Sequence, residues 1–143
     1  MPASGVIDNV DEQIIEILRK DSRTPYTEIS DIVRLTEGTI RGRVDKLVRD
    51  GVIKRFTIDV SPGKRIAAII FISTEPMTSA SSISEMIKSE KGVDAVYEIT
   101  GDHDIAVFFS AFTLGDLKSR VEGIKKLEGV HDTNTTVILQ EFK

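Results

Sequence analysis

The chain has 143 residues, of which 40% are hydrophobic and 29% are charged, a composition that is typical of a folded, soluble protein. It contains no cysteine and no apolar run close to the roughly 18 residues that span a bilayer, so disulfides, zinc–thiolate sites, thiol catalysis and a membrane partner are excluded. The formal net charge of −4 argues against a protein that coats nucleic acid indiscriminately.

A first amphipathic helix is predicted near the start of the chain, capped by Asp8 or Asn9 and ending at about Asp21. Apolar residues such as Ile14 and Leu18 recur at helical spacing along it. Acidic residues lie in its first turn and basic residues in its last, an arrangement that the helix dipole favours. Together with two further helices, it can enclose a small core.

The second predicted helix covers residues 27–33, and only Arg34 and Leu35 separate it from the third. The third helix begins after Thr36, whose hydroxyl can accept a hydrogen bond from a backbone N–H of the first turn. It ends near Gly51, since glycine readily adopts the left-handed conformation that closes a helix. Two short helices joined in this way predict a helix-turn-helix, and duplex DNA is therefore the first candidate partner.

One face of the third helix is apolar and the other is basic. Ile40, Val44 and Leu47 fall at positions i, i+4 and i+7, so they form a stripe that faces a core. Between Arg34 and Arg55, seven basic residues stand against three acidic ones. Eight of the nine arginines lie in residues 1–65, and the rigid donor fork of arginine suits phosphates and guanine edges. Arg19 and Arg23 are interpreted as solvated helix surface.

Several residues of the third helix are candidates for DNA contact. Arg41 is expected to reach base edges or phosphates, because it lies one turn into the helix on the side away from the apolar stripe. Arg43, Lys46 and Arg49 are expected to contact phosphate, which positions a protein without specifying sequence. Thr39 can contact phosphate or pack, and packing is the favoured interpretation. The candidate set is Thr36, Glu37, Gly38, Thr39, Arg41, Gly42, Arg43 and Lys46.

A strand and a domain boundary are predicted after the helices. Val52 to Val60 alternates between two sets of residues, which is the period of a strand leading away from the helices. Lys54 and Arg55 in this strand either touch flanking DNA or are simply solvated. Ser61-Pro62-Gly63-Lys64 is a turn signal, so we predict a DNA-binding domain over residues 1–60 and a linker over 61–65.

The remaining residues, 66–143, predict an α+β domain. An almost unbroken apolar run is typical of a buried strand, and Ser82 to Glu85 reads as a capping box that opens a helix. The order β-α-β-β-α-β is the ferredoxin-like arrangement, one antiparallel sheet with both helices on one face. Its elements are expected at Ile66–Thr74, from Ser82 to near Gly92, Val93–Thr100, Ile105–Phe112, from the Thr113 cap to Gly129, and Val130–Phe142.

The segment Gly101-Asp102-His103-Asp104 connects two predicted strands and has two interpretations. A plain hairpin turn is the default for glycine and aspartate between strands. The segment also places two carboxylates and an imidazole beside apolar strands, so it could hold the ammonium and carboxylate of an amino acid. Thr133 and Thr135 share one face of the last strand and either line such a pocket or belong to the core. A metal site is not favoured, since His103 and His131 are the only histidines.

The order and spacing of these motifs resemble the Lrp/AsnC, or feast/famine, transcriptional regulators of archaeal type over essentially the full chain. The opening resemblance runs from Ile7 to Arg23. The recognition helix and the segment behind it are matched by Leu35-Thr36, Thr39-Ile40, Arg43-Val44, Leu47 and Gly51-Val52-Ile53. The ligand-binding domain is matched by Gly101 to Asp104 and by Gly129-Val130, Thr133, Thr135 and Leu139.

The resemblance implies a homodimer formed through the sheet of the second domain, with further assembly into tetramers or octamers. It also implies an amino-acid effector bound near Gly101, Asp102, His103 and Asp104, with Thr133 and Thr135 adjacent. One departure from the family is that Glu37, Gly38 and Gly42 occupy exposed positions of the recognition helix where side chains normally reach the DNA bases. These glycines either permit close backbone approach to DNA or reflect surface drift.

Three functions follow in order of preference. The first is a cytoplasmic, sequence-specific transcriptional regulator, not an enzyme, without metal or other cofactor, whose DNA affinity an amino acid modulates. The second is an amino-acid-binding module with weak or no specific DNA binding, suggested by Gly38 and Gly42. The third is a small ferredoxin-like enzyme with its chemistry at Asp102, His103 and Asp104. The absence of a signal-like segment at Met1–Gly5 supports the cytoplasmic expectation.

Overall fold

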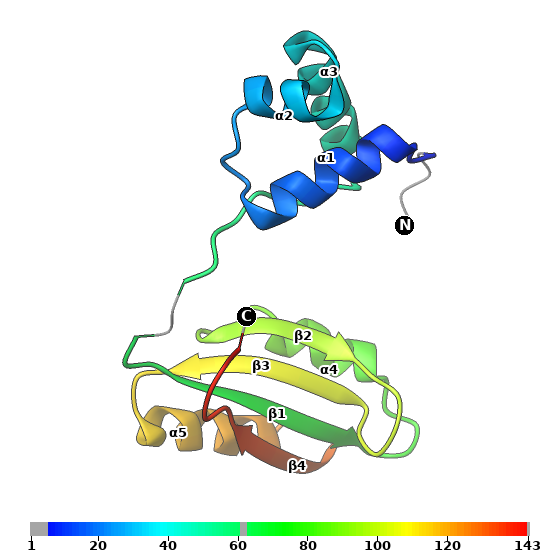
Figure 1. Ribbon diagram of the computed structural model, residues 1–143. Coiled ribbons are helices and arrows are strands. Elements are labelled where there is room, and N and C mark those ends of the chain that lie inside the picture. Colours follow the sequence, from blue (N-terminus) through cyan, green and yellow to red (C-terminus); the bar gives the residue numbers. More distant parts are fainter. Residues whose placement is uncertain (1–5, 61–62, 143) are drawn as a thin grey trace. The chain divides into compact units, whose positions relative to one another are not determined.

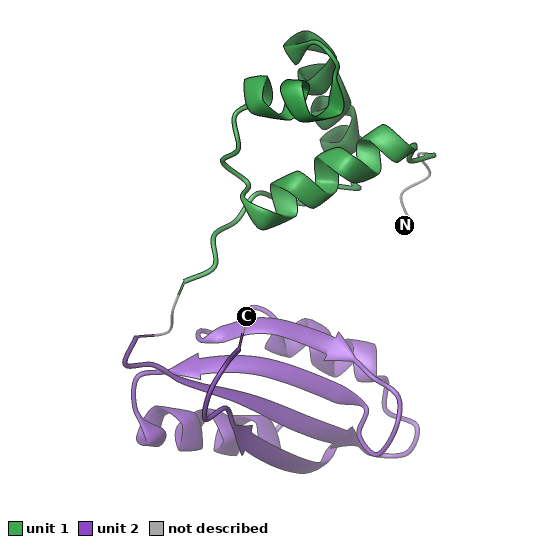
Figure 2. Ribbon diagram, in the orientation of Figure 1, with its two compact units in different colours: residues 1–60 green, residues 61–143 purple. Residues whose placement is uncertain are grey.

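The computed structural model describes residues 6–60 and 63–142 and divides the chain into two compact units (Figures 1 and 2). The helical unit comprises residues 1–60 and the sheet unit residues 61–143. The expectations for Met1–Gly5, and for Ser61 and Pro62 of the linker, lie outside the described residues. Each unit has its own core, so the two are described separately.

Three helices make up the helical unit: α1 (Asn9–Lys20), α2 (Tyr26–Val33) and α3 (Glu37–Arg49). Asp8 caps α1 through a reciprocal capping box, in which its carboxylate accepts from the backbone N–H of Asp11 at 2.9 Å. The Thr36 hydroxyl caps α3 by accepting from the Thr39 backbone N–H. Gly51 follows α3 with a φ of 74°, the left-handed conformation expected of it. The three predicted helices are confirmed.

Branched aliphatic side chains fill the core of the helical unit. Ile14, Ile29 and Ile40 are fully buried, and Val44 is almost so. They come from all three helices, so the apolar stripe predicted on α3 does face α1 and α2. The opposite side of α3 is left to water, which makes its charged residues available.

The strand predicted over Val52–Val60 is wrong for the single chain. These residues are irregular, although Val52 N–H and Ile53 N–H both donate to the Leu47 carbonyl at 2.9 and 3.0 Å. The alternation was real, but a strand needs a partner, and the described part of the helical unit contains no other strand. Phe56, Ile58 and Val60 consequently remain largely exposed.

The sheet unit has the predicted ferredoxin-like order. Its strands form one antiparallel sheet in the order β2-β3-β1-β4, and both helices cover the same face (Figure 1). The elements are β1 (Ile66–Thr74), α4 (Ala80–Ile87), β2 (Val93–Glu98), β3 (Ile105–Ala111), α5 (Leu114–Lys125) and β4 (Val130–Val137).

The two faces of the sheet differ in their environment. Ala68, Ile70 and Ile72 of β1 are buried against α4 and α5, together with the alternate residues of β3. The intervening residues project from the other side of the sheet. Within the described sheet unit, no helix covers that side. We call this side the open face, and its larger apolar residues are Ile69, Phe71, Tyr97 and Phe108.

Several predicted boundaries in the sheet unit are corrected: β2 ends at Glu98 rather than Thr100, and α5 at Lys125 rather than Gly129. Helix α4 begins at Ala80 rather than after Ser82, because the Ser79 hydroxyl supplies the cap and accepts from the Ser82 backbone N–H. The helix ends at Ile87, well before Gly92. Strand β4 ends at Val137, since the register pairs Val137 with Ala68 and the partner strand begins only two residues earlier.

Candidate DNA interface and effector loop

The exposed side of α3 carries most of the candidate DNA-binding residues. Arg41, Lys46 and Arg49 are all exposed and rise from successive turns of the helix. Thr39 is exposed as well, and its hydroxyl lies 2.8 Å from that of Thr36, so the interpretation of Thr39 as a packing residue is wrong. The helix therefore presents cations and hydroxyl groups on one accessible surface.

Arg41 is held from two sides. Its Nη2 donates to Glu37 Oε1 at 3.0 Å, and its guanidinium carbon lies 5.1 Å from the centre of the Tyr26 ring. The side chains of Arg41 and Glu37 remain 59% and 47% exposed. Sequence reasoning missed Tyr26, because a cation–π contact between two helices leaves no periodic signal. The Glu37–Arg41 spacing of four residues was a visible signal of an ion pair.

Arg43 has partners other than the expected phosphate. Its Nη1 donates to Asp8 Oδ2 at 2.7 Å and to Asp11 Oδ1 at 2.9 Å, which ties α3 to the start of α1. Asp11 is buried, with 8% of its surface exposed. The hydrogen bond from Arg43 holds the pKa of Asp8 below its ordinary value, and the two carboxylates raise the pKa of Arg43. The structure thus uses Arg43 to join two helices.

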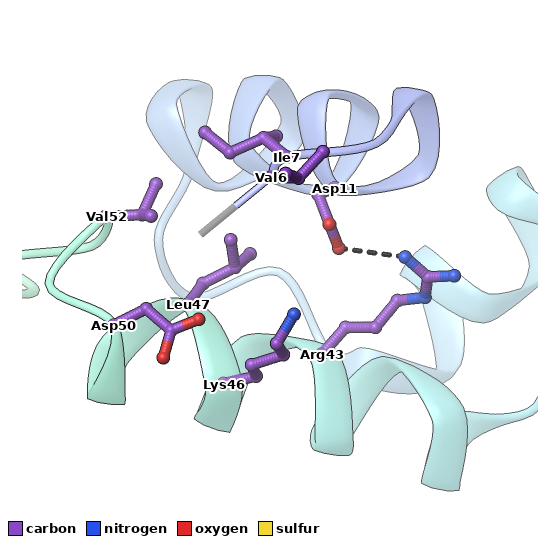
Figure 3. A pocket seen from close by; sticks show the side chains of 8 residues that line it. All are labelled: Val6, Ile7, Asp11, Arg43, Lys46, Leu47, Asp50 and Val52. Atoms are coloured by element: carbon purple, nitrogen blue, oxygen red, sulfur yellow. Dashed lines mark hydrogen bonds and ion pairs between the residues drawn. The ribbon is translucent and has the colours of Figure 1, made fainter. Parts of the chain in front are cut away.

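A shallow hollow lies between the start of α1 and the end of α3 (Figure 3). The close-up shows Arg43 reaching across it to Asp11, with Lys46 beside them. It leaves room for about one water molecule, too little for a small-molecule ligand. Its lining consists of Val6, Ile7, Asp11, Arg43, Lys46, Leu47, Asp50 and Val52.

Gly38 and Gly42 open the surface of α3. A Cβ placed at either glycine would meet no atom within 4 Å, so neither glycine is required by packing inside the chain. An interior helix glycine costs roughly 1 kcal/mol relative to alanine. The absence of side chains at Gly38 and Gly42 therefore leaves room for the backbone of a partner to approach.

The Gly101–Asp104 segment forms a tight connection between β2 and β3. Gly101 has a φ of 112°, which L side chains rarely adopt. The Asp104 carboxylate accepts from the Thr74 backbone N–H at 2.8 Å and from its hydroxyl at 3.1 Å. Asp104 is thereby tied to the end of β1. Among the described residues, Asp102 has neither a hydrogen bond nor an ion pair.

His103 is fixed against the open face. Its ring stacks on Phe71 with centroids 5.3 Å apart, and its Nδ1 lies 3.1 Å from the Ser73 hydroxyl. These neighbours come from β1, far from His103 in sequence, so the chain pattern did not indicate them. The imidazole contacts Ser73 and the Asp104 carboxylate contacts Thr74, so these two groups do not form an acid–base pair with each other.

Thr133 and Thr135 do not meet the Gly101–Asp104 segment within one chain. They pair with Ile72 and Ile70, so they lie on the helix-covered side of the sheet, two strands from β3. That separation is about 10 Å. The Thr133 hydroxyl is buried without a hydrogen-bond partner among the described residues. The expectation that these threonines adjoin the segment is therefore not met inside a single chain.

Residues 6–60 and 63–142 hold neither a candidate metal site nor a candidate membrane-spanning helix. No group of three or more His, Cys, Asp and Glu side chains in this part of the chain could hold a metal ion. No helix there is long and apolar enough to cross a membrane.

Comparisons with known proteins match both units. Residues 7–54 match the winged helix-turn-helix DNA-binding family, and residues 67–143 match the Lrp/AsnC ligand binding domain. The HTH-type transcriptional regulator LysM of Sulfurisphaera tokodaii is 40% identical over 94% of this chain and 96% of its own. Regulator FL11 of Pyrococcus furiosus is 37% identical over 97% and 93%.

Solved structures share the fold of the whole chain. The crystal structure of PH0061 superposes with a TM-score of 0.88 at 26% identity, covering 97% of both chains. AsnC of E. coli gives a TM-score of 0.80 at 28% identity, over 96% of this chain and 95% of that one. The arrangement of a helix-turn-helix followed by a four-stranded α+β domain is therefore common to all three proteins.

Proposed function

The chain belongs to the Lrp/AsnC family of transcriptional regulators, and from this premise we propose which of its residues act on DNA, on an effector and on a second copy. The helical unit reads duplex DNA through α3, and the sheet unit binds a free amino acid and joins copies of the chain. The observation that carries the proposal is the exposed basic side of α3, which follows the Thr36 cap within a matched DNA-binding module. The protein regulates transcription and catalyses no reaction.

DNA contact is assigned to the exposed side of α3. Arg41 reaches guanine edges in the major groove, and Lys46 and Arg49 contact phosphates. Thr36 and Thr39 lie at the start of the helix, where their hydroxyls and the first-turn N–H groups meet the DNA backbone. Gly38 and Gly42 allow the close approach that this contact needs. Arg43 is reassigned from phosphate contact to joining α3 and α1.

Assembly is assigned to the open face of the sheet. Ile69, Phe71, Tyr97 and Phe108 form an apolar surface on which two copies can pack sheet to sheet. Exposed apolar patches of this kind mark interaction surfaces. The resulting homodimer presents two recognition helices to a symmetric operator, and dimers associate further into tetramers or octamers. The chain works in the cytoplasm.

The effector site is assigned to the segment from Gly101 to Asp104. Asp102 is the carboxylate available to pair with an α-ammonium group, because Asp104 is already bound to Thr74. Turn N–H groups near Gly101 can receive the carboxylate of the amino acid. Thr133 and Thr135 lie two strands away, so they enter this site only from another copy.

A mobility-shift experiment on a duplex selected from random sequences tests the assignment of α3. Arg41→Ala should cost about 1–3 kcal/mol of affinity and relax sequence preference, since it removes a base contact. Lys46→Ala should weaken binding to every sequence and reduce the salt slope by about 1. Arg19→Ala on α1 is the matched control. Unchanged binding by Arg41→Ala would contradict the assignment, and a wild-type protein without sequence preference would favour the amino-acid-binding module instead.

A further inference from the structure

Glu37 is the one acidic residue in the first turn of α3, and it stands directly beside Arg41. Its carboxylate accepts from Arg41 at 3.0 Å, while the Tyr26 ring supports the guanidinium from α2 at 5.1 Å. Tyr26 is half-buried and packs on the helical core, so its ring is a fixed support. The cation that is best placed to meet DNA is therefore held by an anion on the same exposed surface.

The charge of Glu37 acts against binding in general. Non-specific DNA binding rests on cations that neutralise phosphates, and a carboxylate on the approaching surface is repelled by the same phosphates. Glu37 also occupies donors of Arg41 that would otherwise bind phosphate. The helix dipole favours an acidic residue in the first turn, but the Thr36 hydroxyl already caps α3. Helix capping alone therefore does not require Glu37.

The chemistry of Glu37 matches one feature of the major groove. The amino group N4 of cytosine is a donor, and carboxylates accept from it, whereas O6 and N7 of guanine accept from arginine. Glu37 and Arg41 are one helical turn apart on the same surface and bonded to each other. Glu37 can therefore accept from a cytosine amino group while Arg41 donates to the guanine of the same or an adjacent base pair. The hydrogen bond between the two side chains can persist in this arrangement.

We propose that Glu37 is a specificity-determining residue of the recognition helix, which accepts from a cytosine amino group at the cognate site and opposes binding elsewhere. Tyr26 is a positioning residue that keeps Arg41 beside Glu37. This inference rests on the proposed DNA-binding function of α3. The repulsion by the Glu37 carboxylate therefore weakens binding to non-cognate sequences, where no cytosine amino group compensates for it.

The test uses the full-length chain, its selected duplex and a scrambled duplex, with affinity measured over a range of salt concentrations. Glu37→Gln should bind the scrambled duplex more tightly by about threefold to tenfold and with a steeper salt slope, because one cation is released toward phosphate. Its ratio of specific to non-specific affinity should fall by about tenfold or more. Glu12→Gln, the same change of charge at an exposed position of α1, should leave this ratio unchanged.

A base analogue separates recognition from simple repulsion. Replacing each operator cytosine in turn by a pyrimidine that lacks the 4-amino group should weaken wild-type binding at one position and have no effect at that position for Glu37→Gln. Tyr26→Leu should lower the specificity ratio, and Tyr26→Phe, which keeps the ring, should preserve it. If wild type discriminates between duplexes and Glu37→Gln discriminates equally well, this inference fails and the proposed function stands. If wild type itself does not discriminate, the proposed function fails.

Discussion

The helical unit and the sheet unit each bury an apolar core, but their accessible surfaces differ in chemistry. The helical unit holds 10 basic and 11 acidic residues and the sheet unit 9 and 12, but between Arg34 and Arg55 seven basic residues stand against three acidic ones. The helical unit buries a few aliphatic residues and exposes cations on α3. The sheet unit buries one side of its sheet and leaves the apolar open face accessible. In one unit the accessible groups are suited to a charged polymer, and in the other they are suited to a second apolar surface.

This difference predicts how the two units respond to mutation. Changes on the exposed side of α3 should alter binding without altering folding, because those side chains contribute little to the core. Changes on the open face should alter assembly, because its apolar side chains remain partly or largely exposed in the single chain. The mutations below test whether the two units respond separately in this way.

The largest effect is expected in the core of the helical unit. Ile40→Ala should lower its free energy of unfolding by about 2–5 kcal/mol, because Ile40 is fully buried in a small core that cannot absorb a cavity. Calorimetry should then show the sheet unit melting as in wild type and the helical unit melting far earlier. Ile32→Ala, at an exposed position, should change little. Equal loss in both units would contradict their separate cores.

The next effect concerns the open face. Phe71→Glu should weaken the homodimer by about 2 kcal/mol or more, since a buried charge would replace an aromatic anchor at the centre of the contact. Sedimentation should show monomers at concentrations where wild type is dimeric. Leu114→Glu, at an exposed position of α5, is the control and should stay dimeric. A Phe71→Glu protein that remains dimeric would place the contact elsewhere.

A smaller effect is expected where α3 meets α1. Arg43→Met should cost about 1–2 kcal/mol of stability, because it leaves the buried carboxylate of Asp11 without its side-chain donor. Arg43 lowers the pKa of Asp8 from its ordinary value of 3.8, so the stabilisation is present above that pH and is lost as the pH falls through the lower folded-state pKa.

Urea unfolding at several pH values tests whether the stabilisation from the Arg43–Asp8 contact is lost as the pH falls. The wild-type curve should fall as the pH drops below 3.8, and the Arg43→Met curve should be flatter over that interval. Arg49→Met removes an exposed cation from the same helix and should keep the wild-type slope. Parallel slopes for wild type and Arg43→Met would show that the contact with Asp8 does not stabilise the fold.

The smallest effect concerns backbone strain. Met77 has a φ of 70° in a turn closed by the Thr78 N–H and the Glu75 carbonyl, a position that favours glycine. Met77→Gly should raise the stability of the sheet unit by about 0.5–1 kcal/mol, because it relieves this strain. Arg34→Gly, at a φ of 58°, is the matching change in the helical unit. Loss of stability in Met77→Gly would mean that the Met77 side chain makes a stabilising contact.

The sequence predicted the features that depend on neighbouring residues in the chain. It missed those that depend on contacts between residues far apart in the sequence. The Asp8 and Thr36 caps and the bounds of β1 follow from short-range rules, so they were predictable. Ser82 was mistaken for the cap of α4 because Ser79 carries the same hydroxyl three residues earlier. Contacts such as Arg43 with Asp8 join residues 35 positions apart, and no periodicity reports them.

The same reasoning explains the two failures nearest to function. Val52–Val60 has the period of a strand, but pairing needs two segments, and residues 6–60 of the helical unit offer no second one. Thr133 lies on the same side of the sheet as Ile72, which became evident only from the register between β1 and β4. Both residue patterns have the period of a strand, but a pattern in one segment does not show which other segment lies beside it.

The central claim is that an amino acid bound by the sheet unit alters DNA binding by the helical unit. The affinity of the full chain for its selected duplex, measured with and without each of the twenty amino acids, tests this directly. We predict that at least one amino acid shifts the affinity by about 5- to 150-fold, a coupling of about 1–3 kcal/mol. The shift should disappear in Asp102→Ala, which leaves DNA affinity without amino acid unchanged. Equal affinity with every amino acid, in a protein that still selects its duplex, would contradict the claim.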